Sequence, residues 1–194
     1  AIGATYTFRN GHKQKAGCIG DIGTTSFFPS KNLGCYGDGG ALFIRDNQLA
    51  ERAHMIANHG QEIKYHHDIV GCNSRLDTLQ AAILDVKLKY LDEYTAARNQ
   101  VADRYDKELA SVKGIILPQR ANDSTHVFHQ YTIRVENHRR DELKDYLMQQ
   151  GIPSMIYYPI PLHLQKAYTK EGQGKGTFPV AEQLSEEVLS LPMH

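Results

Sequence analysis

One lysine occupies a position that suits nucleophilic chemistry. Lys31 follows an apolar, strand-like stretch, lies five residues after Ser26, and precedes a turn that contains Gly34, Gly37, Gly39 and Gly40. A lysine amine held in a sheltered pocket becomes nucleophilic, because desolvation or a neighbouring cation lowers its pKa. It can then form a Schiff base, while a nearby hydroxyl binds a phosphate. The spacing favours amino-group chemistry with pyridoxal 5'-phosphate (PLP), although an isolated lysine is more often a solvated surface residue.

Four segments in order resemble motifs of one enzyme family, the DegT/StrS-type PLP-dependent sugar-nucleotide aminotransferases. They are residues 26–40 (SFFPSKNLGCYGDGG), 71–82 (GCNSRLDTLQAA), 157–163 (YYPIPLH) and 189–194 (LSLPMH). The resemblance covers essentially all 194 residues. Within the family it is nearest to enzymes that aminate the 3-keto group of a UDP-linked N-acetylamino uronic acid. It implies an α/β fold: the C-terminal part of the large domain of a fold-type I PLP aminotransferase, plus most of the small α+β domain.

The resemblance implies cofactor-binding roles for Ser26, Lys31 and Asn73. Lys31 would be the catalytic residue, which first binds PLP and then moves a proton between the substrate carbon and the cofactor. Ser26 would bind the phosphate, with a strand-end hydroxyl bonded to the backbone as the alternative. Asn73 would reach the phosphate held by the neighbouring subunit. It could also be a helix N-cap, and both roles can hold together.

The resemblance also implies substrate contacts for Arg75, Tyr157, Tyr158 and His163. A guanidinium pairs with a carboxylate through two parallel hydrogen bonds, but a structural salt bridge explains Arg75 nearly as well. The two tyrosines and His163 lie in a proline-stiffened segment that faces the sugar in the family. Without the resemblance, adjacent tyrosines more often pack in a core.

Members of the family are about twice as long as this chain, as expected for a large and a small domain. Their first half carries a phosphate-binding helix start, an aromatic residue that stacks on the cofactor ring, and an acid that pairs with the pyridine nitrogen. The chain is therefore expected to be a central-to-C-terminal fragment, which binds PLP weakly or not at all and is inactive alone. The parent would be a homodimer with shared active sites.

The leading functional hypothesis is transfer of an amino group from L-glutamate to the 3-keto group of a UDP-linked sugar, in the biosynthesis of a surface polysaccharide such as lipopolysaccharide. The first alternative is a non-catalytic fragment or dimerisation module without cofactor. The second is a PLP-dependent sugar dehydratase. Those enzymes carry histidine in place of the Schiff-base lysine, so Lys31 argues against this alternative.

The composition is that of a soluble globular protein, with 41% hydrophobic and 23% charged residues. Lys+Arg and Asp+Glu both number 22, so no net charge attracts nucleic acid or a membrane. No apolar run approaches the ~20 residues of a membrane span. Cys18, Cys35 and Cys72 form no CxxC pair, which favours free thiols in the cytoplasm. The adjacent His66 and His67 do not share a helix face, so no metal site is expected.

Three domains are expected: residues 1–75 as the remainder of the large domain, 76–112 as a long linking helix, and 113–194 as the small domain. Apolar residues recur every three or four positions over 77–109, which predicts one helix ~50 Å long, begun by a capping box of Ser74 and Asp77.

Further elements follow from local patterns. Short buried strands are predicted over 22–28 and 41–45, and further strands near 131–135 and over 154–158. Helices are predicted over 47–58, over 138–150 with Gly151 at its C′ position, and from Pro179 to Val188. The Gly-rich stretch 172–176 is predicted to be a loop.

Overall fold

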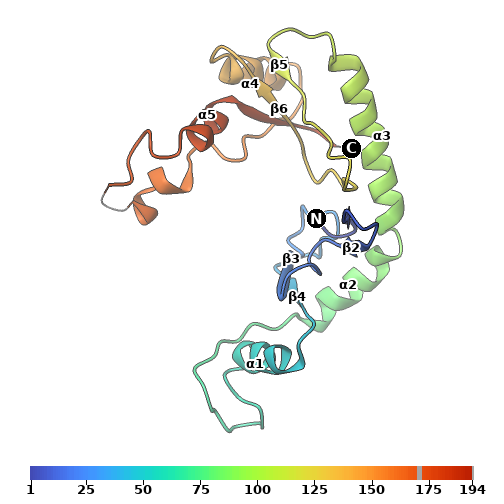
Figure 1. The fold of residues 1–194 in the computed structure, drawn as a ribbon, viewed down its shortest axis with the longest axis vertical. Coiled ribbons are helices and arrows are strands. Elements are labelled where there is room, and N and C mark those ends of the chain that lie inside the picture. Colours follow the sequence, from blue (N-terminus) through green and yellow to red (C-terminus); the bar gives the residue numbers. More distant parts are fainter. Residues whose placement is uncertain (170–171, 194) are drawn as a thin grey trace. The chain divides into compact units, whose positions relative to one another are not determined.

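In the computed structural model, which describes residues 1–169 and 172–193, the chain forms two compact units (Figure 1). Unit 1 comprises Ala1–Ala97 and Ala121–Val127, and unit 2 comprises Arg98–Arg120 and Phe128–His194. The division falls within helix α3, Leu91–Leu109. The domain limits expected from the sequence, 1–75, 76–112 and 113–194, stay a prediction.

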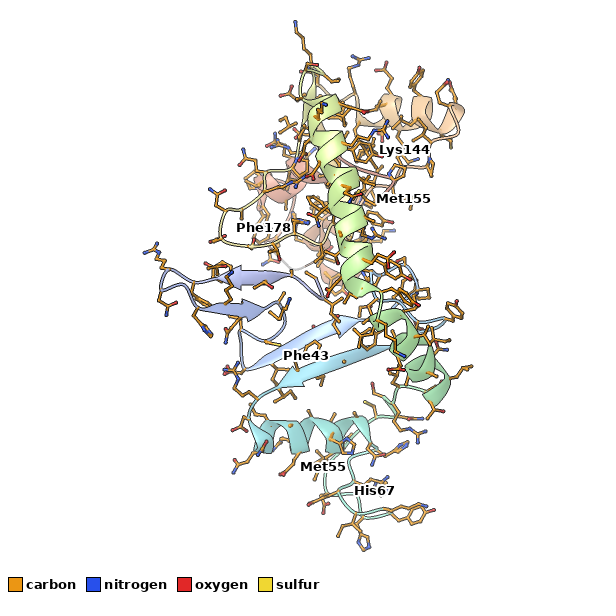
Figure 2. The ribbon with its side chains drawn as sticks, turned by 90° about the vertical axis from the view of Figure 1, so that its right-hand side faces the viewer. Phe43, Met55, His67, Lys144, Met155 and Phe178 are labelled. Carbon is orange, nitrogen blue, oxygen red and sulfur yellow. The ribbon has the colours of Figure 1, made fainter. Side chains whose placement is uncertain are left out.

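Unit 1 contains two antiparallel hairpins and a helix. Strand β1 (Thr5–Thr7) pairs with β2 (Lys13–Lys15), and β3 (Ile22–Ser26) pairs with β4 (Gly40–Ile44). Helix α1 (Asn47–Ala57) follows β4; Figure 2 labels Phe43 on β4 and Met55 on α1. The expected strands and helix are confirmed within a few residues. The strands are not fully buried, however, because exposure alternates along them and leaves Ile22 48% and Leu42 52% exposed.

A segment that follows α3 in the sequence returns to unit 1 and extends the first hairpin. The backbone N–H of Thr7 donates to Asp123, 2.6 Å away, and that of Thr125 donates to Thr5 at 2.9 Å. Tyr6 and Ser124 form an isolated antiparallel bridge between these contacts. Residues 121–127 therefore belong to unit 1, which no local sequence signal indicated.

The single helix expected over 77–109 is divided into α2 (Thr78–Leu88) and α3. At the break, the N–H of Tyr90 donates to the carbonyl of Lys87 three residues earlier, in a tighter turn than the α-helix allows. No glycine or proline marks this position, and the apolar spacing continues through it, so the sequence pattern concealed the break. The expected capping box is also wrong, because the N-cap is Asp77 rather than Ser74 and its side chain makes no capping hydrogen bond.

Unit 2 is built on a three-stranded antiparallel sheet in the order β5 (Ile115–Ile116), β6 (Tyr131–Val135), β7 (Val188–Leu191). Its helices are α4 (Arg140–Gln149) and α5 (Pro179–Glu187), with the short 3₁₀ helices η1 (Leu162–Leu164) and η2 (Lys166–Tyr168) between them. The buried core gathers apolar side chains of α3, β6 and β7 and their flanks: Ala102, Phe128, Tyr131, Ile133, Val135, Leu189 and Met193.

Two of the local predictions in unit 2 can be compared directly with the structure. Gly151 follows α4 with φ +76°, and the N–H of Ile152 donates to Leu147 at 2.8 Å, as expected for a glycine-terminated helix. The strand predicted over 154–158 is wrong, since only Met155 pairs there, with Ser190 of β7. Pro153 and Pro159 flank this bridge, and a proline cannot donate to a strand ladder.

A partly exposed ion-pair network bonds to the buried Tyr131 at the edge of the unit 2 core. The Tyr131 hydroxyl donates to Asp106 at 2.5 Å, and Arg120 bridges Asp106 and Asp103 at 2.6 and 2.7 Å. Burial first, and then the Asp106 carboxylate, raise the pKa of Tyr131 well above its ordinary value. The phenol therefore stays protonated and remains a donor at the edge of the core. Across the described part of the chain, no helix combines the length and apolar character needed to span a membrane.

Candidate functional site

The loop that carries Lys31 is closed at its base by the backbone N–H and carbonyl of Phe27, a buried residue directly after β3. The Phe27 N–H donates to the carbonyl of Gly39 at 2.8 Å. Its carbonyl accepts from the N–H of Cys35 at 2.8 Å and from the Cys35 thiol at 3.0 Å. Residues 28–38 thus leave and return to one point of the chain, with Lys31 between the two ends.

The glycines of this segment serve close packing. A Cβ on Gly34 would lie 2.5 Å from the carbonyl oxygen of Pro29, and one on Gly39 would lie 2.8 Å from a methyl carbon of Leu76. Neither glycine has a positive φ. What these positions require is the absence of a side chain, so that the loop can fold back on itself.

Helix α2 holds the loop from one side. The Tyr36 N–H donates to Oε1 of Gln80 at 2.8 Å, and the Lys87 ammonium donates to the carbonyl of Gly34. Leu84, between these two positions, packs in one buried cluster with Phe27, Leu33, Cys35 and Leu91. Sequence analysis gave Gln80 and Lys87 no role. Their spacing of seven residues, two helical turns, places them on the same face of α2 and was the available signal.

The Ser26 side chain and the Lys31 backbone both bond the backbone of Phe28. The N–H of Phe28 donates to Oγ of Ser26 at 3.2 Å, and the Phe28 carbonyl accepts from the N–H of Lys31 at 2.8 Å. The bond at Ser26 matches the alternative of a strand-end hydroxyl bonded to backbone. Because it uses the oxygen as acceptor, the hydroxyl proton is still able to bond a phosphate oxygen. Lys31 itself is half-buried.

Asn32, next to the lysine, anchors the loop to the returning segment of unit 1. Its Nδ2 donates to the carbonyl of Val127 at 2.8 Å. Its Oδ1 is buried and has no hydrogen-bond partner among the described residues. A buried acceptor of this kind can accept a hydrogen bond from a polar group that enters beside Lys31.

Asn73 and Arg75 form a second constellation in unit 1. Nε of Arg75 donates to Oδ1 of Asn73 at 2.9 Å, and both residues are exposed. Asn73 forms a bridge with Asn58, just after α1, so it is held against that helix end and is not the N-cap of α2. Within the described residues, Arg75 has no carboxylate at salt-bridge distance, which leaves its guanidinium available for an external one.

Tyr157, Tyr158 and His163 lie together in unit 2. They line one hollow of about 740 Å³, whose other walls are mainly apolar and include Phe178 and Leu184. The rings of Tyr157 and Tyr158 meet edge to face with centroids 5.6 Å apart. Tyr158 is 72% exposed, so the alternative of core packing does not apply to it.

His163 differs from the tyrosines because its side chain is 8% exposed. Its Nε2 lies 3.0 Å from Oε1 of Glu182, and its ring packs edge-on against Phe178 at 4.8 Å. Hydrogen bonds from the Gly176 N–H, and in smaller measure from His163 and Phe178, hold the pKa of Glu182 below its ordinary value against the opposing effect of burial. Glu182 was missed in the sequence, where its signal was an acid in the first turn of a helix opened by Pro179.

The seven predicted site residues therefore form three groups: Ser26 with Lys31 and Asn73 with Arg75 in unit 1, and Tyr157, Tyr158 and His163 in unit 2. The described residues contain no cluster of three or more His, Cys, Asp or Glu side chains able to hold a metal ion.

The profile of the DegT/DnrJ/EryC1/StrS aminotransferase family matches residues 1–194. The chain belongs to this family. It is 47% identical over 198 residues to a pleiotropic regulatory protein of Geobacillus stearothermophilus, covering 100% of this chain and 50% of that protein. It is 46% identical over 192 residues to the UDP-2-acetamido-2-deoxy-3-oxo-D-glucuronate aminotransferase of Pseudomonas aeruginosa, covering 98% and 52%.

Solved structures of the DegT/DnrJ/EryC1/StrS family agree with the fold. S. venezuelae DesV, in complex with a ketimine intermediate, matches with a TM-score of 0.90 and 44% identity over 98% of this chain and 50% of DesV. The expected α/β fold class and family are thus confirmed. The chain spans about half the length of the curated relatives it matches.

Pyridoxal phosphate is the cofactor of this aminotransferase family. The residues in hand fit part of it, since a half-buried lysine lies beside a serine hydroxyl able to donate and a buried Asn32 oxygen that lacks a donor. A phosphate oxygen of the cofactor would accept the hydrogen bond that the Ser26 hydroxyl can donate.

The bond from Tyr36 to Gln80 predicts a measurable loosening of the lysine loop. Gln80→Ala removes the acceptor, which should cost about 0.5–1.5 kcal/mol locally and speed amide exchange at Tyr36 from a few-fold to about tenfold. Hydrogen–deuterium exchange followed by NMR measures this rate. Gln80→Glu keeps an acceptor oxygen at the same place and is the matched control. Equal exchange rates in Gln80→Ala and the wild type would contradict the tether.

Proposed function

We propose that this chain is the lysine-bearing part of a PLP-dependent aminotransferase, which transfers an amino group from L-glutamate to the 3-keto group of a UDP-linked sugar in surface-polysaccharide biosynthesis. The observation that carries the proposal is the Lys31 loop. It carries the half-buried Lys31, whose backbone N–H bonds the same residue, Phe28, as the Ser26 hydroxyl, on a turn held by Gln80 and Lys87. Membership of the family supports the reaction class.

On this proposal, Lys31 is both the anchor of the cofactor and the base that moves the proton. When bound, PLP supplies an electron sink that makes the carbon bearing the amino group acidic. The lysine amine would then take the proton from that carbon and deliver it to the cofactor. The fixed loop matters here, because proton transfer requires the amine within hydrogen-bond reach of both positions.

The phosphate end would be held by Ser26, and by Asn73 of a second subunit. Ser26 offers the proton of its hydroxyl, as its oxygen already accepts from Phe28. Asn73 is exposed and bonded to Arg75, so its amide and the adjacent guanidinium form one polar unit directed away from the buried cluster of unit 1. An exposed unit of this kind suits insertion into the site of a partner in a homodimer.

In unit 1, Arg75 would bind a carboxylate of the sugar nucleotide. In unit 2, Tyr157, Tyr158 and His163 would contact the sugar from the hollow that they line. Arg75 lacks a carboxylate partner among the described residues, which suits a uronate substrate. The relative in P. aeruginosa is named as acting on a UDP-linked 3-oxo-glucuronate. This is what supports a carboxylated 3-keto sugar as the acceptor.

A second candidate is a non-catalytic piece or dimerisation module. The observation that favours it is length, since the chain spans about half of its relatives. The dehydratase alternative loses support because Lys31 occupies the position at which those enzymes carry histidine.

Titration with PLP tests whether the chain by itself holds the cofactor. We expect the 194-residue chain to bind PLP weakly or not at all, because the helix N-terminus that gives the phosphate most of its donors lies in the first half of family members. The visible absorption band of the lysine-bound cofactor reports binding, and Lys31→Ala controls for reaction with other lysines. Tight binding at one cofactor per chain would overturn this expectation.

In the full-length parent protein, Lys31→Ala should lower the rate of transamination by about 10²–10⁴-fold or more, because both the cofactor anchor and the proton carrier are lost. Formation of the amino sugar measures turnover, and borohydride reduction followed by peptide mass analysis locates the cofactor. Lys13→Ala, an exposed lysine on β2, is the control. Near-native turnover by the Lys31 variant would make the assignment wrong.

A shared active site predicts complementation between two inactive parents. Lys31→Ala and a double variant with Asn73→Ala and Arg75→Ala are mixed and allowed to exchange subunits. A mixed dimer then has one pocket with both defects and one with neither, so activity returns. If activity stays absent while exchange is confirmed by mass, the polar pair acts within its own chain.

A further inference from the structure

We propose that Glu182 is a positioning residue that shapes the substrate hollow of unit 2, holding His163 and the loop before α5 in place. The inference rests on the proposed function of Tyr157, Tyr158 and His163. It assigns to Glu182 a structural task that neither the motif nor the family match supplies. Glu182 touches neither the proposed substrate nor the cofactor in this role, and acts through His163 and the backbone.

The carboxylate of Glu182 gathers donors from separate points of the chain. Oε1 lies 3.0 Å from Nε2 of His163 in η1. The Gly176 N–H lies 2.9 Å from Oε1 and 2.8 Å from Oε2, and the N–H of Phe178 donates to Oε1 at 3.2 Å. A carboxylate accepts up to about four hydrogen bonds, so this one is largely saturated.

These bonds join two walls of the same hollow. One wall is the segment that carries Tyr157, Tyr158 and His163, and the other is formed by Phe178 and the first turns of α5. Figure 2 labels Phe178, whose ring meets His163 at 4.8 Å. The side chains of His163 and Glu182 are 8% and 12% exposed, so the tie lies beneath the surface of the hollow. Without the carboxylate, His163 keeps its ring contact with Phe178 but loses its hydrogen bond to α5.

The geometry also separates the task of His163 from that of the tyrosines. The Nε2 atom of His163 is engaged by Glu182, whereas Tyr158 is 72% and Tyr157 38% exposed. His163 therefore forms a wall, and the tyrosines offer the exposed polar groups. The other acids of α5 point to different partners: Glu187 pairs with Arg134 at 2.7 Å, and Glu186 lies 3.8 Å from His138.

The first test uses the 194-residue chain and limited trypsin digestion. Lys175 is exposed in the loop before α5. It precedes Gly176, whose N–H donates to the Glu182 carboxylate. Glu182→Ala should speed cleavage after Lys175 by roughly tenfold, since a hydrogen bond to a charged group is lost. Glu182→Gln keeps one acceptor and should give a smaller increase. Glu186→Ala, on the same helix and 55% exposed, should leave the rate unchanged.

The second test uses the full-length parent enzyme and separates binding from chemistry. Glu182→Ala should raise KM for the sugar nucleotide by roughly tenfold, while the half-reaction with the amino donor keeps its rate. Folding of each variant is checked by far-UV circular dichroism. A loosened loop with unchanged KM, or an unchanged cleavage rate in a folded variant, overturns the inference. Absence of all turnover in the wild-type parent overturns the proposed function instead, and the cleavage result then still decides whether Glu182 holds the loop.

Discussion

The lysine site depends on the two backbone polar groups of Phe27. Its N–H and carbonyl bond to Gly39 and Cys35, so a loop of eleven residues, 28–38, begins and ends at one buried position. This closure is possible only where glycine leaves room at positions 34 and 39. The flexible side chain of Lys31 therefore starts from a fixed backbone position, because the loop can neither shift nor rotate without breaking several hydrogen bonds.

Helix α2 also fixes the lysine loop within unit 1. Gln80 and Lys87 bond the loop from one face of the helix, and Leu84 fills the space between them. In addition, the Asn32 amide donates to the carbonyl of Val127, in the segment that returns to unit 1 after α3. The loop is thus held by a helix and by a distant segment, while the amine of Lys31 takes part in neither set of contacts described here.

In unit 2, a charged side chain holds the site residues in place through hydrogen bonds. Glu182 collects donors from η1, from the Gly-rich loop and from the residue before α5, and so stabilises a hollow whose lining is otherwise mainly apolar. Burial of a carboxylate is favourable only when its oxygens are bonded, and the lowered pKa of Glu182 is the expected result. Both units therefore hold predicted site residues in place through hydrogen bonds from residues to which no catalytic role is assigned.

The sequence by itself determined the elements whose signals are local. It indicated the strand before Lys31, the glycine that ends α4, the proline that opens α5, and a motif specific enough to point to the family. It did not reveal the break at Lys89–Tyr90, because the apolar period continues through it. Nor did it reveal that residues 121–127 pair with β1, or that Gln80, Lys87 and Glu182 hold the two sites. These contacts are decided by the tertiary structure, because a hydrogen bond between residues up to 120 positions apart produces no periodic pattern in the sequence.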